Sequence, residues 1–87
     1  MSDESVMSFP CSFPIKLMGR ETDEFRRTVR KLVEKHTGPL EDDAVESSLS
    51  RNGRFVSATI TVVAESREQL DNIYRDATAH DDVIMAL

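Results

Sequence analysis

The chain has 87 residues, with 16 acidic and 11 basic side chains, 39% hydrophobic residues and a net charge of −5. This length allows one folded domain and excludes two separate domains or a large barrel enzyme. Proteins that bind nucleic acids are usually basic, because neutralising phosphates supplies much of their affinity. The acidic balance therefore argues against nucleic-acid partners and against adsorption on anionic membranes.

Cysteine usage and the first residues predict the compartment. Cys11 is the only cysteine, whereas secreted proteins of this size usually carry several, so we expect a reducing, cytoplasmic environment. The opening MSDESVMS lacks the features of a signal peptide, and no apolar run approaches the roughly 20 residues that span a bilayer. We expect residues 1–8 to form a flexible tail and residues 9–87 a single domain.

The first regular elements are a strand and a helix. Phe13, Ile15 and Leu17 alternate with other residues, which predicts a strand that ends at Gly19 and in which Pro14 points its missing N–H away from a partner. Residues 23–37 carry one apolar helical face. Thr22 or Asp23 can cap its start, and Gly38-Pro39 stops the helix. The apolar face consists of Phe25, Val29, Leu32 and Val33. On the polar face, spacing of four residues predicts the ion pairs Asp23–Arg27 and Arg30–Glu34. We interpret the basic cluster of Arg26, Arg27, Arg30 and Lys31 as a solvated, ion-paired face, with docking of an acidic partner or a carboxylate metabolite as the alternative.

A hairpin follows. Asn52-Gly53 is a strong signal for a two-residue turn, and Phe55–Ala64 is rich in β-branched residues. With this turn, Val45, Ser47 and Leu49 face Ile60, Ala58 and Val56, which puts the apolar positions of both strands on one side. Glu41-Asp42-Asp43, just before the hairpin, lacks the spacing of a calcium loop and is interpreted as a solvated strand start.

The last elements are a helix and a strand. Ser66-Arg67-Glu68-Gln69 is a capping box, followed by a helical face of Leu70, Ile73, Tyr74 and Ala77. His80-Asp81-Asp82 ends this helix, and the alternation of Val83, Met85 and Leu87 predicts a final short strand.

The order strand, helix, strand, strand, helix, strand predicts a ferredoxin-like α+β sandwich. Its two helices need an apolar surface, and one face of a four-stranded antiparallel sheet supplies it. The other sheet face then stays open to a partner. On the hairpin it carries a semi-polar set suited to contact: Phe55, Ser57, Thr59, Thr61 and Val63.

No catalytic or cofactor motif is found. No serine elbow accompanies His36 and His80, which we interpret as helix-terminal residues, and no metal-ligand spacing or nucleotide-binding glycine loop occurs. RNA-recognition folds of this class stack bases on aromatic residues, but the strand Arg54–Ile60 has one aromatic residue. We expect no catalytic residues, no metal and no cofactor.

The sequence resembles the YbeD-like family of small bacterial proteins. The resemblance begins at FPCSFPIKLMG (residues 9–19), continues at SATITV (57–62), SREQL (66–70) and Ile73-Tyr74, and ends at VIMAL (83–87). It implies an ACT-like version of the ferredoxin-like fold and no established activity. Members resemble regulatory domains that bind small effectors beside metabolic enzymes.

Three functions remain open. The first is a non-catalytic regulatory module that acts by contact through the open sheet face, either with an unidentified protein, such as an enzyme, or with a second copy in a homodimer. The second is a small-molecule effector domain, because Gly19 stands where ACT domains have a glycine that lets an effector approach. Its ligand loop would be Met18, Gly19 and Arg20. A small enzyme that uses His36 or His80 is a third, remote alternative.

Overall fold

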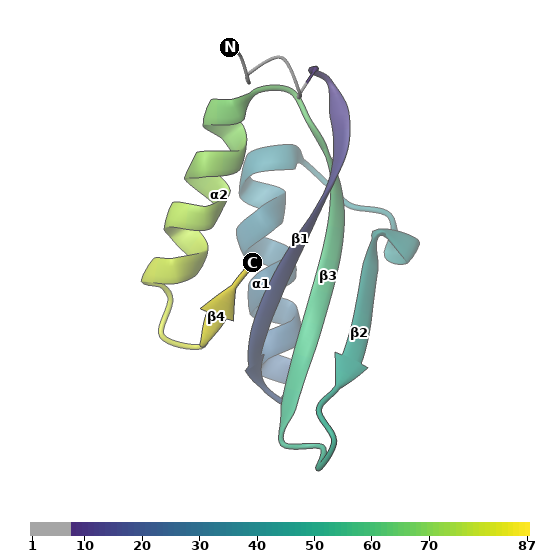
Figure 1. Ribbon diagram of the computed structural model, residues 1–87, viewed down its shortest axis with the longest axis vertical. Helices are drawn as coiled ribbons and strands as arrows, with labels where there is room; N and C mark the ends of the chain where they lie inside the picture. Colours follow the sequence, from purple (N-terminus) through teal and green to yellow (C-terminus); the bar gives the residue numbers. More distant parts are fainter. Residues whose placement is uncertain (1–7) are drawn as a thin grey trace.

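The structure is a computed structural model that describes residues 8–87. Of the tail predicted for residues 1–8, only Ser8 is among them, and its side chain is exposed. The elements in chain order are β1 (Cys11–Arg20), α1 (Asp23–Thr37), the short 3₁₀ helix η2 (Asp42–Ala44), β2 (Val45–Leu49), β3 (Phe55–Ala64), α2 (Arg67–Ala79) and β4 (Met85–Ala86). The strands form one antiparallel sheet in the order β2-β3-β1-β4 (Figure 1). The predicted ferredoxin-like α+β fold is confirmed.

Both helices pack on the same side of the sheet. In Figure 1, α1 lies behind the long strands β1 and β3. The predicted apolar faces of α1 and α2 join alternate residues of these strands in one core, and each large side chain buried there contributes about 1.5–3 kcal/mol. The fully buried large residues are Phe25, Ile15, Leu17, Ile60, Ile73, Val29, Val33, Val56 and Val62.

The ends of α1 follow the predicted signals. Thr22 Oγ1 accepts a hydrogen bond of 2.9 Å from the Phe25 N–H, which satisfies one of the free donors of the first turn. At the other end, Gly38 takes a φ of 83° and its N–H donates to the Glu34 carbonyl at 2.9 Å. A positive φ there favours glycine, so the helix stops at Thr37 as predicted.

The hairpin has the predicted register but a different turn. Val45 pairs with Ile60, Ser47 with Ala58 and Leu49 with Val56, as expected. The prediction of a two-residue Asn52-Gly53 turn is wrong. The Ser50 carbonyl accepts from the Gly53 N–H at 3.0 Å, and the Ser50 N–H donates to the Phe55 carbonyl at 2.9 Å, so four residues, 51–54, form the loop. Its centre lies where the shorter turn would, so the register is unchanged.

The capping box of α2 is present with one variation. Ser66 Oγ accepts from the Gln69 N–H at 3.1 Å, whereas Gln69 Oε1 accepts from the N–H of Glu65 rather than of Ser66. The same amide donates through Nε2 to the His36 carbonyl at 2.8 Å. Gln69 therefore ties the start of α2 to the last turn of α1.

Gly19 differs from its predicted role. The strand β1 continues through Arg20, and Gly19 is not among the glycines with positive φ, so the prediction that it ends the strand through its backbone freedom is wrong. A Cβ at this position would overlap the Phe25 ring and lie 2.6 Å from the Asp82 carbonyl oxygen. Glycine is required here by close packing of α1 and of the segment before β4 against β1.

The last strand is shorter than predicted. Only Met85 and Ala86 form β4, and it is Ala86, opposite Leu17, that packs toward the core. Lys16 exchanges both backbone hydrogen bonds with Leu87. The direction of backbone hydrogen bonding alternates along a strand, so Pro14 and Lys16 both face the edge of β1 on which β4 pairs. The missing N–H of Pro14 lies on this edge, beyond the point where β4 pairs. Within residues 8–87, no helix is long and apolar enough to cross a membrane.

Candidate functional site

The side of the sheet that faces away from the helices is the first candidate site. Since β1 and β3 pair in register along ten residues, every second residue of each strand lies on this face. The five hairpin residues that the sequence pointed to, Phe55, Ser57, Thr59, Thr61 and Val63, all lie there. Their neighbours on β1 are Ser12, Pro14, Lys16, Met18 and Arg20.

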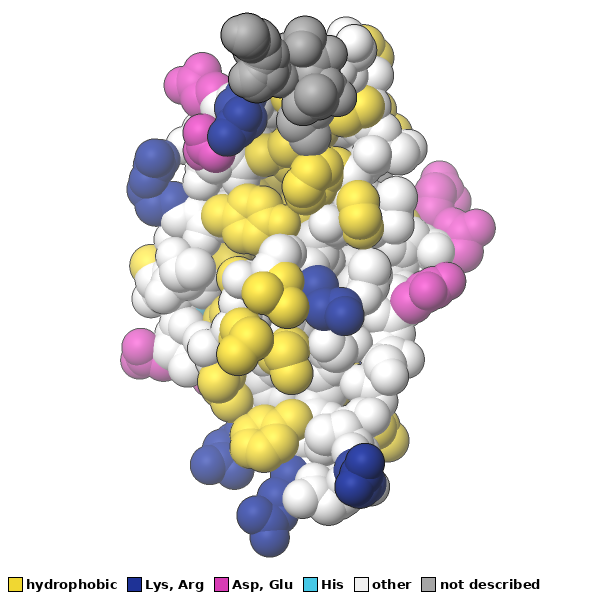
Figure 2. Space-filling view, viewed as in Figure 1, with side chains coloured by type: hydrophobic (Ala, Val, Ile, Leu, Met, Phe, Trp, Pro, Cys, Tyr) yellow, Lys and Arg dark blue, Asp and Glu magenta, His cyan; other side chains and the backbone are white. Residues whose placement is uncertain are grey.

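An apolar stripe runs along this face across β1 and its two neighbouring strands, β3 and β4. We define the open-face stripe as Met18, Phe55, Met85 and Leu87. Met18 lies opposite Met85 in the β1–β4 pairing, and Leu87 continues the same face opposite Lys16. Met85 and Leu87 are 48% and 62% exposed. Figure 2 shows hydrophobic side chains gathered along this side of the molecule, with Lys or Arg side chains beside them and at the lower end.

Sequence reasoning located only part of the stripe. It named Phe55 but placed the face on the β2–β3 hairpin, and it missed Met18, Met85 and Leu87 as members of this surface. The signal that was available is the alternation of Met85 and Leu87 in the last strand, but alternation alone does not say which set faces the helices.

Several contacts hold this surface in shape. The guanidinium carbon of Arg20 lies 5.8 Å from the centre of the Phe55 ring, a cation–π contact between directly opposed residues. Tyr74 Oη donates 2.8 Å to the Leu87 carbonyl, which ties the end of β4 to α2. Burial raises the pKa of Tyr74 further above its usual 10.0, and the protonated phenol keeps this donor at neutral pH.

The predicted effector loop is not a loop. Met18, Gly19 and Arg20 all belong to β1, with Met18 on the open face and Gly19 closed off by Phe25. The nearest cavity, about 230 Å³, lies past the end of the strand, and Arg20 is the one predicted residue that lines it. The other lining residues are Thr22, Glu24, Phe25, Asp81, Asp82 and Ile84.

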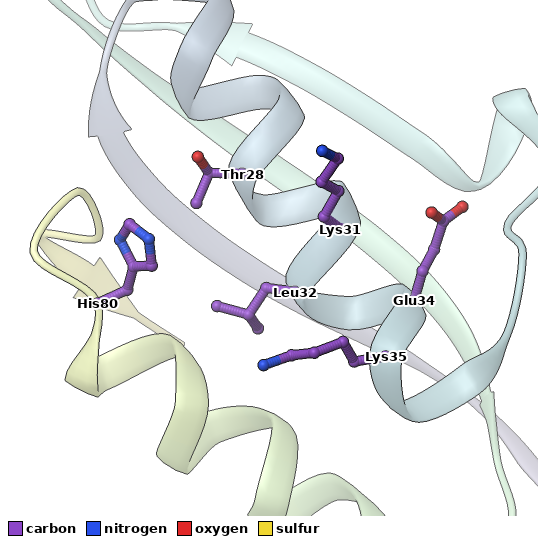
Figure 3. A pocket seen from close by; sticks show the side chains of 6 residues that line it. All are labelled: Thr28, Lys31, Leu32, Glu34, Lys35 and His80. Atoms are coloured by element: carbon purple, nitrogen blue, oxygen red, sulfur yellow. The ribbon is translucent and has the colours of Figure 1, made fainter.

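A larger groove lies on the helical layer, away from the sheet. It measures about 630 Å³ and is lined by Thr28, Lys31, Leu32, Glu34 and Lys35 of α1 and by His80 at the end of α2. Figure 3 shows Thr28, Leu32 and Lys35 on the side of α1 that faces α2, with His80 across from them. We call it the helix groove. Sequence reasoning placed Lys31 on a solvated, ion-paired face and did not connect it with His80.

The two histidines have separate surroundings. His36 Nε2 lies 2.7 Å from Asp76 Oδ2, and Lys35 Nζ lies 3.3 Å from the same oxygen. Hydrogen bonds from His36 first, and then Lys35, hold the pKa of Asp76 below its usual 3.8. His80 lines the helix groove, which His36 does not. The structure therefore uses His36 to join α1 to α2, as a helix-terminal residue with a partner.

The basic residues of α1 are largely ion-paired. Arg30 pairs with Glu34 as predicted, at 3.2 Å, and also with Asp42 at 3.3 Å. The predicted pair Asp23–Arg27 is wrong, because Asp23 lies 3.8 Å from Arg26 instead, whose other partner is Glu21 at 2.7 Å. Glu41, Asp42 and Asp43 are exposed as predicted, but Asp42 and Asp43 belong to the helical turn η2 and do not start the strand. Among residues 8–87, no three His, Cys, Asp or Glu side chains gather in a way that could hold a metal ion.

Comparison with known proteins places the chain in a family. Residues 4–87 match the family described as "Protein of unknown function (DUF493)". The chain belongs to this family. A "UPF0250 protein" from Chromobacterium violaceum is 46% identical over 89 residues, and one from Nitrosomonas europaea is 39% identical over 87, each covering 100% of both chains. This is the YbeD-like family that the sequence resembles, and it is uncharacterised.

A solved structure supports the fold of this DUF493 member. The solution structure of protein HP0495 from H. pylori matches with a TM-score of 0.77 over 93% of this chain and 85% of that chain. At 20% sequence identity, the likeness shows that the fold is shared.

Proposed function

We propose that this protein is a non-catalytic, cytoplasmic regulatory module that binds a protein partner through the open-face stripe. The observation that carries the proposal is a contiguous apolar surface, Met18, Phe55, Met85 and Leu87, on a sheet face that neither helix covers. Contiguous exposed apolar patches on small proteins are often interaction sites. Methionine side chains adapt to irregular partner surfaces, which suits two of the four residues to this role.

The charges beside the stripe favour an acidic partner. Lys16 and Arg20 are exposed on the same face of β1, and Glu46 is the acidic residue of this face on β2. This basic margin contrasts with the net charge of −5 of the whole chain. Complementary charge at the edge of an apolar patch speeds association and fixes orientation.

A different protein fits this surface better than a second copy. A two-fold contact centred on the stripe would bring Lys16 and Arg20 of both copies near each other, and like charges oppose such a contact. We therefore commit to a protein partner that presents apolar and acidic side chains, such as an enzyme subject to regulation. Self-association is the competing outcome.

A non-catalytic role is supported by how the histidines are used. Within residues 8–87, the His36 side chain is hydrogen-bonded to Asp76 and the His80 side chain to the backbone N–H of Asp82. Neither histidine is hydrogen-bonded there to a serine, threonine or cysteine, which nucleophilic catalysis would require.

Two measurements test the proposal. Wild-type protein and Met85→Asp, Lys16→Glu and Leu49→Asp variants serve as baits in native extract, and each captured protein is then titrated in purified form. Leu49 is a matched control, because it is 57% exposed but lies on the other side of the sheet, opposite Val56. We expect a partner that binds wild type and Leu49→Asp, and whose affinity falls at least about tenfold with Met85→Asp and with Lys16→Glu. Equal binding by all four proteins would refute the proposal.

Sedimentation velocity over a wide concentration range distinguishes binding of a different protein to the stripe from binding of a second copy. We expect a monomer throughout. A dimer that Phe55→Asp abolishes would instead assign the stripe to self-association.

Effector binding remains a second candidate, on the cavity beside Arg20. Arg20 and the carboxylates of Glu24, Asp81 and Asp82 line it together, and an amino acid needs both charges in its site. At about 230 Å³ the cavity is smaller than the roughly 300–1,000 Å³ of most ligand sites, which is why this candidate comes second. Thermal-shift measurements with amino acids and short carboxylates decide it, since a ligand that binds only the folded state raises the melting temperature.

A further inference from the structure

The helix groove combines the volume of a ligand site with an excess of positive charge. Its volume of about 630 Å³ falls in the usual range for small-molecule sites, about 300–1,000 Å³. Four residues of α1, Thr28, Lys31, Leu32 and Lys35, follow the spacing of one helical face, so the helix presents them together. Leu32 is nearly buried and gives the groove an apolar floor.

The lysines are not neutralised equally. Lys35 Nζ lies 3.3 Å from Asp76 Oδ2, which it shares with His36. Lys31 makes no ion pair with any residue from 8 to 87. The groove therefore has one ammonium group without a counter-charge and a second ammonium group whose carboxylate is shared with His36.

The one carboxylate that lines the groove is engaged elsewhere. Glu34 Oε2 accepts 2.9 Å from the Leu40 N–H and 3.2 Å from Arg30 Nε. Figure 3 shows its side chain leaving α1 on the side away from His80. Glu34 thus compensates Arg30 and not the two lysines.

His80 supplies a neutral donor. Its Nδ1 accepts a hydrogen bond of 3.1 Å from the Asp82 N–H, and a nitrogen that accepts cannot carry a proton. The ring proton is then on Nε2, which leaves that nitrogen as a donor. With the Thr28 hydroxyl, the groove offers two ammonium groups and two neutral donors.

We propose that the helix groove binds a small dianion, either a phosphate monoester or a short dicarboxylate. The charge of the ligand would lie between Lys31 and Lys35, with His80 Nε2 and the Thr28 hydroxyl as further donors and with the ligand's carbon skeleton on Leu32. Because the groove is open and its charges are screened by salt, we expect dissociation constants in the millimolar range. This site is separate from the open-face stripe, so it stands or falls independently of the proposed partner binding.

Amide NMR titrations of the full chain test the site. The probes are inorganic phosphate and succinate, each at constant ionic strength, with sodium chloride as the monoanion control. We expect saturable shifts at Thr28, Lys31, Leu32, Lys35 and His80 with one or both dianions. Saturation by phosphate alone assigns a phosphate ester, and saturation by succinate alone assigns a dicarboxylate.

Two charge reversals sharpen the result. Lys31→Glu removes the unpaired ammonium group, whereas Arg51→Glu makes the same change of net charge in the exposed loop between β2 and β3. We expect Lys31→Glu to weaken binding at least about tenfold and Arg51→Glu to change it less than about twofold. Equal weakening by both variants, shifts centred outside the groove, or no saturation up to about 20 mM would each overturn the proposal.

Discussion

Replacing Gly19 with alanine should destabilise the protein strongly, because the added methyl group has no room. A Cβ there would overlap the Phe25 ring and lie 2.6 Å from the Asp82 carbonyl oxygen. Phe25 is 1% exposed and anchors α1 in the core, so relief requires moving the helix or expelling the ring. Overpacking a core costs about 1–3 kcal/mol, and displacing a buried phenylalanine costs about 3–5 kcal/mol.

We therefore expect the free energy of unfolding to fall by about 3 kcal/mol, which is a large part of the roughly 5 kcal/mol expected for a domain of this size. For domains of 60–100 residues each kcal/mol lowers the melting temperature by about 4–8 °C, so Gly19→Ala should melt about 15 °C lower. Urea and thermal unfolding, followed by circular dichroism, measure both quantities.

Gly53→Ala provides the control for a purely conformational effect. Gly53 has a φ of 76°, and a Cβ added to it would meet no heavy atom within 4 Å. Its substitution therefore strains the backbone without a collision and should cost of order 1 kcal/mol. Trimming the ring with Phe25→Leu should lessen the effect of Gly19→Ala by about 1 kcal/mol in a double-mutant cycle. If Gly19→Ala costs no more than Gly53→Ala, or if the two changes at 19 and 25 are additive, the packing argument is wrong.

Three further predictions concern titration and capping. Tyr74, the only tyrosine, should ionise with an absorbance midpoint above pH 10.0 when the phenolate is followed in a pH titration. The free energy of unfolding should fall as the pH rises through 10.0 toward the folded-state pKa. A midpoint at or below pH 10.0 contradicts the burial argument. Since hydrogen bonds from His36 and Lys35 lower the pKa of Asp76, its contribution is present above pH 3.8 and is lost as the pH falls through the lower folded-state value. Asp76→Asn should therefore reduce stability at pH 7 and flatten the dependence between pH 7 and acid, which acid titration of both proteins measures. Thr22→Ala should lower the free energy of unfolding by about 1 kcal/mol in urea, and no change would mean that the Phe25 N–H finds another acceptor.

Local signals predicted most of the elements because their causes are local. A side-chain oxygen three residues before a free N–H, as at Thr22 and Ser66, begins a helix wherever it lies in the fold. The hairpin register also followed from the pattern, since shifting it by one residue would expose Val56 and Ile60. These rules fail where two elements meet. A glycine is needed at position 19 because Phe25 and Asp82 leave no room for a side chain there.

The candidate sites depend on contacts between elements that are distant in the sequence. Sequence placed the open face on the correct side of β3, but the stripe is completed by Met85 and Leu87, whose orientation follows from the pairing of β4 with β1. The helix groove joins Lys31 to His80, and these residues lie 49 positions apart in the chain. Neither juxtaposition has a signature in residue spacing.

The sequence by itself determined the family, the order of strands and helices and the side of the sheet that the helices cover, because periodicity and capping act over a few residues. Tertiary structure alone decided which face the last strand turns outward, why residue 19 has no side chain, and which charged groups share a groove. These depend on distances between segments that only the folded chain brings together.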